Sequence, residues 1–268
     1  MRFFLSLYKI EQMKIALIQS DLVWESPNDN RINFEAKIDA IEGSVDLIVL
    51  PEMFTTGFSM NASKMAETMK GETVLWMQNL AKNKNCAIAG SLIISEADKF
   101  YNRLLFVFPT GEIQYYDKRH LFTLAGENKM YTAGNKKQIV EYLGWKICLQ
   151  VCYDLRFPVF ARNVENYDLL LYVANWPKVR ITAWDILLKA RAVENLSYTI
   201  GVNRTGLDVN QHEYNGHSQV IDFLGNSILE SQGNESIFIV DLDKDLMLET
   251  RRKLDFLRDQ DVFEIKHF

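Results

Sequence analysis

Short apolar runs alternate with amphipathic stretches along most of the chain, and this alternation is the feature that most limits the fold. Runs with the character of buried strands lie at 14–19, 47–50, 87–94, 169–173, 198–202 and 237–240. Helices are expected at 28–43, 73–84, 184–196 and 242–254. Short apolar runs are typical of buried strands, whereas longer stretches with apolar side chains three or four residues apart are typical of helices. The alternation predicts an α/β or layered α+β fold.

Several apolar runs are separated by turn residues and therefore predict β-hairpins. The first hairpin joins 104–108 to 112–116, and the second joins 138–142 to 145–151. The turn of a third hairpin is expected at 224–226. Antiparallel hairpins do not fit a purely parallel, doubly wound sheet. No Pro/Gly/Ser-rich linker or internal repeat divides the 268 residues. We therefore expect one domain, residues 13–268, in which two mixed sheets pack face to face with helices outside.

Charge and hydropathy disfavour several classes of partner. The formal net charge is -5 and no basic block stands out, which disfavours nucleic acid and anionic membranes. No apolar stretch approaches the length of a membrane span. Residues 1–12 begin like a signal peptide, but the apolar part is short, Lys9 and Glu11 interrupt it, and no small-residue cleavage site follows. We interpret residues 1–12 as a dispensable extension and expect a cytoplasmic protein.

The cysteines and histidines predict neither disulfides nor a metal site. Three cysteines are an odd number that suits a reducing compartment. Cys148 and Cys152 share one predicted strand, where four residues span roughly 13 Å, beyond the roughly 7 Å Cα limit of a disulfide. Cys86 starts an apolar run and is interpreted as a small core residue. The four histidines lack ligand-like spacing, and there is no Cys-x-x-Cys pattern. No metal or other cofactor is expected.

Three predicted strand segments end on side chains that can do chemistry. The apolar run 147–151 ends at Cys152, the apolar run 47–51 ends at Glu52, and the mixed strand segment 113–117 ends at Lys118. A thiol nucleophile, a carboxylate and an ammonium are the groups needed for acyl transfer through a thioester. The backbone N–H of Tyr153, one residue beyond the sulfur, is suited to binding an oxyanion.

Each of these residues also has an ordinary structural interpretation when it is taken alone. A free cysteine such as Cys152 is usually a buried structural residue. Glu52 fits a carboxylate that emerges into solvent at a strand end, and Lys118 fits a solvated charged turn. Glu127 lies in a segment where a surface carboxylate is ordinary. His120 is a fallback base, because it shares the strand face of Lys118 if that strand continues.

The combination of these segments resembles a known family. Leu-Pro-Glu at 50–52, Tyr-Asp-Lys-Arg-His-Leu at 116–121 and Val-Cys-Tyr-Asp-Leu-Arg-Phe-Pro at 151–158 resemble, in order, the three signatures of the nitrilase superfamily of carbon–nitrogen hydrolases. The resemblance runs from about Met13 to the C-terminal helix. Within the superfamily, segments 51–58 and 172–177 look most like the omega-amidase branch.

The resemblance implies a fold and a set of residue roles. The fold is a four-layer α-β-β-α sandwich. Cys152 would attack an amide carbonyl, and Glu52 would be the general base. Lys118 and the Tyr153 N–H would stabilise the oxyanion. Glu127 lies where the family carries a second glutamate, which holds the lysine and orients the substrate.

The activity implied by the branch is release of ammonia from the terminal amide of a small 2-oxo dicarboxylic acid monoamide. Trp176, which follows a buried strand, is expected to wall the pocket or to pack in the core. Arg156 and Arg204 are candidates to bind the substrate carboxylate, or to hold loops together. The resemblance also predicts a homodimer.

Three alternatives stay open at this point. The nearest are other activities of the same superfamily, an N-carbamoyl-amide hydrolase or a nitrilase that uses the same four residues. A non-catalytic binding module on the same fold is an alternative of another class. A serine hydrolase is disfavoured because the chain has no Gly-x-Ser-x-Gly motif.

Overall fold

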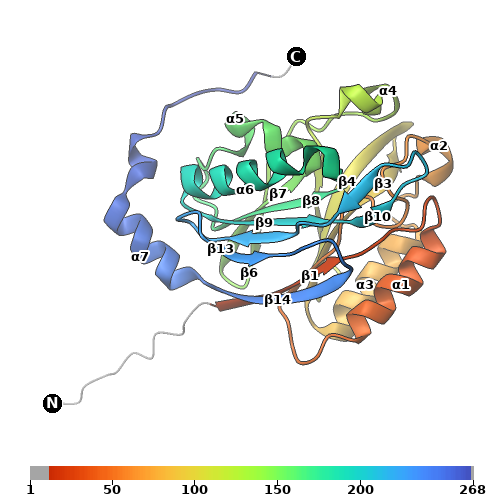
Figure 1. The fold of residues 1–268 in the computed structure, drawn as a ribbon, viewed down its shortest axis with the longest axis horizontal. Helices are drawn as coiled ribbons and strands as arrows, with labels where there is room; N and C mark the ends of the chain where they lie inside the picture. Colours follow the sequence, from red (N-terminus) through yellow and green to blue (C-terminus); the bar gives the residue numbers. More distant parts are fainter. Residues whose placement is uncertain (1–11, 267–268) are drawn as a thin grey trace.

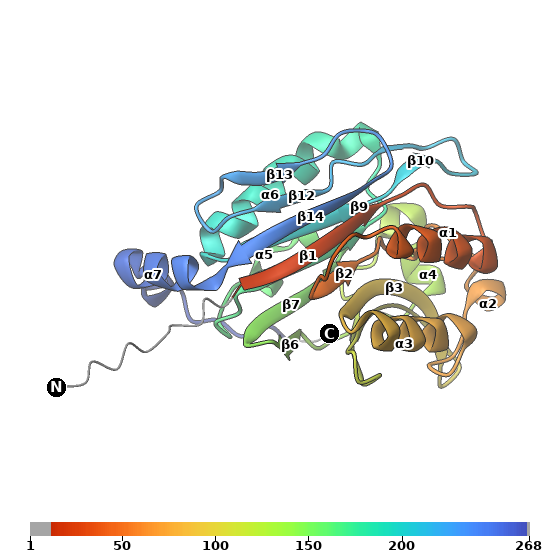
Figure 2. The same ribbon diagram turned by 90° about the horizontal axis from the view of Figure 1, so that it is seen from below.

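Two six-stranded sheets lie face to face in the computed structural model, which describes residues 12–266 (Figures 1 and 2). The first sheet has the order β14-β1-β2-β3-β4-β5 and the second has the order β13-β12-β9-β8-β7-β6. Each sheet is mixed, with three parallel strands at its centre and antiparallel strands at both edges. Helices cover the outer faces. The four-layer α-β-β-α sandwich expected from the sequence is confirmed.

The strands of both sheets fall close to the apolar runs of the sequence. The first sheet contains β1 (Gln12–Gln19), β2 (Leu47–Val49), β3 (Ala87–Glu96), β4 (Lys99–Val107), β5 (Ile113–Asp117) and β14 (Ser236–Asp243). The second contains β6 (Gln138–Tyr142), β7 (Trp145–Val151), β8 (Leu169–Ala174), β9 (Tyr198–Asn203), β12 (Gln219–Ile221) and β13 (Ser227–Glu230). A separate two-stranded sheet pairs β10 (Thr205–Leu207) with β11 (Glu213–Asn215).

The helices range from long amphipathic segments to single turns. The α-helices are α1 (Pro27–Asp39), α2 (Ala62–Met65), α3 (Glu72–Lys84), α4 (Glu127–Met130), α5 (Pro158–Ala161), α6 (Ile181–Asn195) and α7 (Lys244–Leu254). The 3-10 helices are η1 (Thr123–Ala125), η2 (Cys152–Arg156), η3 (Lys178–Arg180) and η4 (Phe256–Asp259). None of the helices within residues 12–266 combines the length and hydropathy needed to cross a bilayer.

Side-chain alternation along β1 explains how one strand contacts two layers. Ile15 and Leu17 belong to the large core that joins the two sheets. Ala16 and Ile18 point to the opposite face and pack in the core that includes α1 and α3. Successive side chains of a strand point to opposite faces, so a strand covered on both sides is apolar at every position. Figure 2 shows α1 and α3 lying against the outer face of this sheet.

On the other side of the sandwich, α6 packs directly on the second sheet. A Cβ atom at Gly201 of β9 would lie 2.5 Å from the Trp184 ring and 2.7 Å from a methyl of Leu188. Both residues belong to α6 and are fully buried. Gly201 therefore permits the close approach of helix and sheet.

The hairpins at 104–116 and 138–151 are confirmed, and the turn at 224–226 does join β12 to β13. Two features were not predicted. β3 and β4 form a further hairpin through Ala97 and Asp98, both at positive φ, and β10 and β11 form a small sheet beside the second sheet. The predicted extension, residues 1–12, lies outside the described residues except for Gln12, which already pairs with Asp243 in the first sheet.

Candidate active site

The three strand ends singled out in the sequence meet between the two sheets. Glu52 follows β2 of the first sheet after Leu50 and Pro51, and Lys118 follows β5 of the same sheet. Cys152 follows β7 of the second sheet. The Lys118 Nζ donates to Glu52 Oε1 at 2.9 Å. Cys152, from the opposite sheet, lines the same cavity as Lys118. The structure therefore brings together side chains from both sheets.

Lys118 forms the centre of a buried cluster, between two carboxylates. Its ammonium donates to both oxygens of Glu127, at 3.0 and 2.9 Å, as well as to Glu52. Glu52 and Glu127 are fully buried, and Lys118 is 1% exposed. The interpretation of these three residues as surface charges is therefore wrong. Glu127 begins the one-turn helix α4, and its Oε2 also accepts the backbone N–H of Phe122.

The charges in the cluster shift one another's pKa. Burial alone would lower the pKa of Lys118, but the carboxylates of Glu127 and then Glu52 outweigh it and raise the pKa well above its ordinary value. Burial raises the pKa of Glu127, and the Lys118 charge opposes that shift. The ammonium is therefore held protonated at neutral pH and is available to stabilise negative charge.

Two asparagine amides complete the cluster, and sequence reasoning missed both. The Asn102 Nδ2 on β4 donates to Glu52 Oε1 at 2.8 Å and to Glu127 Oε1 at 3.3 Å. Asn175 donates its backbone N–H to Glu52 Oε2 at 2.8 Å and its Nδ2 to the Glu52 carbonyl at 2.6 Å. Asn175 follows β8 directly, so it carries the same strand-end signal as Glu52 and Cys152.

Cys152 lies at a sharp turn between β7 and η2. Its φ is +44°, a left-handed conformation that typically costs of the order of 1–3 kcal/mol for a residue with a side chain. Asp154 holds this turn, because its Oδ2 accepts the Val151 N–H at 3.0 Å and the Tyr116 hydroxyl at 2.9 Å. The turn aims the thiol away from the sheet ladder and toward the cavity.

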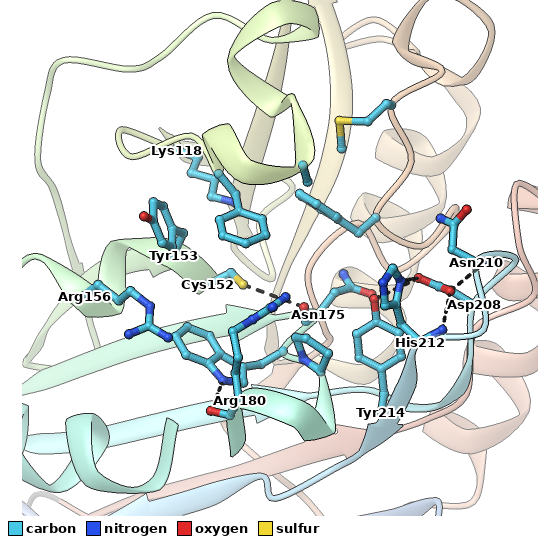
Figure 3. Close-up of a pocket in the computed structure, with 16 residues that line it drawn as sticks. Lys118, Cys152, Tyr153, Arg156, Asn175, Arg180, Asp208, Asn210, His212 and Tyr214 are labelled. Carbon is cyan, nitrogen blue, oxygen red and sulfur yellow. Dashed lines mark hydrogen bonds and ion pairs between the residues drawn. The ribbon is translucent and has the colours of Figure 1, made fainter. Parts of the chain in front are cut away.

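The surroundings of the Cys152 thiol favour its protonated form. Burial, followed by the negative charge of Glu52, raises its pKa well above 9, and Lys118 only partly offsets this shift. The Sγ lies 3.9 Å from the Asn175 carbonyl oxygen (Figure 3). A protonated thiol is a poor nucleophile, so the site requires a base at the moment of attack. Glu52 is a carboxylate that interacts with this thiol.

A cavity of about 260 Å³ opens onto the thiol and the ammonium. Figure 3 shows Cys152, Tyr153 and Lys118 on one side of it. Trp176 also lines the cavity, is 3% exposed, and donates its Nε1 to the Arg180 carbonyl at 2.8 Å. The Trp176 side chain therefore both lines the cavity and belongs to the buried core between the sheets.

The far wall of the cavity comes from the segment that includes β10 and β11, which was not predicted. Asp208, His212 and Tyr214 line this wall. The Asp208 carboxylate organises it by accepting from His212 Nδ1 at 3.0 Å and from the Tyr214 hydroxyl at 3.2 Å. Burial alone would raise the pKa of Asp208, but hydrogen bonds from the His212 backbone and side chain outweigh it and lower the pKa.

Two residues proposed from the sequence are not in the cavity. β5 ends at Asp117, so His120 does not share a strand face with Lys118, and its Nδ1 is bound to Asp154 Oδ1 at 2.8 Å. Arg204 is fully buried and donates to Asp21 Oδ1 at 2.7 Å, to the Leu22 carbonyl and to its own loop. Arg204 therefore has the loop-holding role, whereas Arg156 does line the cavity.

No group of three or more metal-binding side chains occurs among the residues that the structure describes. The site brings together one thiol, two carboxylates, one ammonium and the donors around them. This set is suited to attack on a carbonyl carbon, with proton transfer to and from a leaving amine.

Comparison with known proteins supports the same chemistry. The sequence profile of the carbon–nitrogen hydrolases matches residues 14–252. Omega-amidase YafV of Yersinia enterocolitica is 44% identical over 255 residues, covering 94% of this chain and 98% of the relative. The 2-oxoglutaramate amidase of Bacillus subtilis (strain 168) is 31% identical over 245 residues, covering 90% and 94%.

Among solved structures, the XC1258 protein of Xanthomonas campestris superposes with a TM-score of 0.93 at 43% identity, covering 95% of this chain and 99% of that one. It is described as a CN-hydrolase superfamily protein with an arsenic adduct in its active site. The fold and the matches together define a hydrolase that acts on carbon–nitrogen bonds other than peptide bonds. The chain belongs to the carbon–nitrogen hydrolase family, the nitrilase superfamily, and within it to the omega-amidase-like branch.

Proposed function

We propose that this protein is a cysteine-dependent amidase that releases ammonia from the terminal amide of a small 2-oxo dicarboxylic acid monoamide, 2-oxoglutaramate or 2-oxosuccinamate. The observation that carries the proposal is the cavity at which the Cys152 thiol and the Lys118 ammonium meet, with Glu52 buried behind them. The names of the relatives from Yersinia and Bacillus support the substrate class.

In the acylation half-reaction, the Cys152 sulfur attacks the amide carbonyl carbon and a C–S bond forms. Glu52 takes the thiol proton as the bond forms, which is necessary because the pKa of the thiol is raised. The carbonyl π electrons move to oxygen, giving a tetrahedral oxyanion. Glu52 then gives its proton to the amide nitrogen, the C–N bond breaks, and ammonia leaves a thioester behind.

The oxyanion is stabilised by the Lys118 charge and by the backbone N–H of Tyr153. Both residues line the cavity beside the sulfur. Glu127 and Asn102 hold the ammonium and the base in place through the hydrogen bonds described above. Removal of a single oxyanion donor typically lowers kcat by about a hundredfold to a thousandfold.

In the deacylation half-reaction, water attacks the thioester carbon. Glu52 accepts a proton from that water, a C–O bond forms, and the same donors stabilise the second oxyanion. The C–S bond then breaks to release the carboxylic acid, and the sulfur recovers its proton from Glu52. Each cycle consumes one water and returns Cys152 and Glu52 to their starting protonation states.

Ammonia release from a panel of amides and nitriles tests the proposal. We expect turnover of 2-oxoglutaramate or 2-oxosuccinamate, and loss of that turnover in Cys152→Ala. Mass spectrometry of the protein mixed with a slow amide should detect the acyl group on Cys152. Turnover of N-carbamoyl amino acids or nitriles, with none of any 2-oxo amide, would contradict the substrate class. Unchanged activity in Cys152→Ala would contradict the mechanism.

We also propose that the protein is a homodimer, on the strength of its family resemblance. Size-exclusion chromatography with light scattering at micromolar concentration should give twice the mass of the chain. A monomeric mass at that concentration would contradict the proposal.

A further inference from the structure

Two arginine guanidinium groups line the cavity beside the thiol, and neither is paired with a carboxylate among residues 12–266. Arg156 stacks over the Trp176 ring, with 5.0 Å from its Cζ to the ring centroid, and Arg180 stacks over the Phe122 ring at 5.2 Å. The buried arginines elsewhere are neutralised, as Arg204 is by Asp21. An arginine left without a carboxylate inside a cavity is suited to bind an anionic ligand.

Arg180 is the more confined of the two. Its side chain is partly buried, whereas Arg156 is exposed at the rim. Its backbone carbonyl accepts the Trp176 Nε1 at 2.8 Å, and the Trp176 N–H donates to Asn203 Oδ1 at 2.8 Å. These bonds fix η3, the short helix that ends at Arg180, to the wall of the cavity. Partial burial strengthens the attraction of a guanidinium for an anion, because less water screens the charge.

The other charges that face the cavity do not neutralise Arg180. The one lining carboxylate given by the structure is Asp208, which is 8% exposed and already accepts hydrogen bonds from His212 Nδ1, from the Tyr214 hydroxyl and from backbone N–H groups. Lys118 is neutralised by Glu52 and Glu127. Outside the Lys118 cluster, the cavity lining therefore carries two arginine charges against one carboxylate.

We infer that Arg180 is a specificity-determining residue that binds the substrate's carboxylate, the group at the end opposite the scissile amide. The inference rests on the proposed function, because it assigns the far end of the substrate whose amide reaches Cys152. A planar guanidinium can make two parallel hydrogen bonds to a carboxylate. The Phe122 ring on which it stacks keeps that fork in one orientation. The site would thereby select monoamides of dicarboxylic acids over neutral amides.

Steady-state kinetics of Arg180→Gln test this inference. The quantity to measure is kcat/KM for 2-oxoglutaramate divided by kcat/KM for butyramide, a neutral amide without a carboxylate. We expect this ratio to fall about tenfold to a hundredfold, as expected for loss of a charge-assisted hydrogen-bonded pair. Most of the change should be in KM. Arg180→Lys keeps the charge without the planar fork and should give a smaller fall.

Lys178→Gln is the matched control. Lys178 lies in the same short helix, is exposed, and pairs with Glu213 at 2.7 Å outside the cavity lining. The substitution Lys178→Gln removes one positive charge two residues from Arg180. It should leave the ratio of kcat/KM for 2-oxoglutaramate to kcat/KM for butyramide unchanged. An unchanged ratio in Arg180→Gln, or an equal fall in Lys178→Gln, would overturn the inference. A fall confined to Arg156→Gln would assign the carboxylate to Arg156 and would overturn it as well.

A binding measurement separates failure of this inference from failure of the proposed function. Calorimetric titration of 2-oxoglutaramate into Cys152→Ala protein, with and without Arg180→Gln, needs no turnover. We expect Kd to rise about tenfold to a hundredfold in the double variant. If the wild-type protein hydrolyses no 2-oxo amide, the proposed function fails, and this titration still tests the arginine. Equal Kd values, or no binding to either protein, would overturn the inference.

Discussion

Asn175 donates hydrogen bonds to both the side chain and the backbone of Glu52, although the two residues are 123 positions apart in the sequence. The Asn175 backbone N–H donates to Glu52 Oε2 at 2.8 Å, and its side-chain Nδ2 donates to the Glu52 carbonyl at 2.6 Å. Asn175 follows β8 in the second sheet, whereas Glu52 follows β2 in the first. The position of the proposed base therefore depends on how the two sheets pack.

We predict that Asn175→Ala lowers both stability and kcat. Alanine keeps the backbone donor but removes Nδ2, which leaves the Glu52 carbonyl without that donor in a buried place. Such a loss typically costs about 1–3 kcal/mol in the free energy of unfolding. Urea denaturation and ammonia release measure the two effects. Asn226→Ala, which removes an exposed amide bonded to Asp222, is the control, and equal unfolding free energies in the two variants would contradict the prediction.

The strand-end signal explains which parts of the site were predictable. Glu52, Lys118 and Cys152 each follow a segment that was expected to form a strand, so their neighbourhood followed from the expectation that these strands belong to the packed sheets. Asn102 carries no such signal because it lies within β4, where a single amide has many structural uses. Its contact with Glu52 and Glu127 depends on strand register, which no local pattern specifies. The positions of Arg180 and of the cavity wall that includes β10 and β11 likewise depend on contacts between residues distant in sequence, so they could not be predicted.

We predict that Lys118→Met strongly destabilises the fold as well as abolishing turnover. Glu52 and Glu127 would then be buried together without the cation that each now contacts. Breaking a buried ion pair in this way typically costs about 3–5 kcal/mol. Adding Glu127→Gln to Lys118→Met removes one of the two negative charges and should recover much of that loss. Thermal and urea unfolding measure both variants, and a double variant less stable than the single one would contradict this account.

The same variant carries a pH prediction. Without Lys118, the buried carboxylates would have folded-state pKa values above their unfolded values. A group of that kind favours folding below its unfolded pKa and loses the contribution as pH rises through the folded pKa. The destabilisation of Lys118→Met should therefore be smaller near pH 4.5 than at pH 7. A deficit in unfolding free energy that stays constant between these pH values would contradict the proposed charge repulsion.

Glu52→Gln should change thiol reactivity and turnover in opposite directions. The Glu52 charge is the second cause, after burial, of the raised pKa of Cys152. A neutral glutamine removes that contribution, so the thiolate should form at lower pH and iodoacetamide should react faster at a given neutral pH. Ammonia release should collapse, because the base is gone. Cys152→Ser protein corrects for Cys86 and Cys148, and an alkylation profile shifted to higher pH would contradict the prediction.

His120 provides the last prediction, because its contacts oppose the fallback role of a base. Its backbone N–H and its Nδ1 both bond to Asp154 Oδ1, at 2.9 and 2.8 Å, and its ring stacks on Phe157 with centroids 3.9 Å apart. These contacts support the turn that presents Cys152, since Asp154 also accepts the Val151 N–H. We therefore expect His120→Ala to cost about 1.5–3 kcal/mol of stability, as for a hydrogen bond to a charged group. In His120→Ala, the pH values at which kcat/KM falls on the acidic and basic sides should stay unchanged. His120→Asn can still donate to Asp154 and should therefore lose less stability than His120→Ala. Loss of the limb that reports the catalytic base in His120→Ala would show instead that His120 takes part in proton transfer.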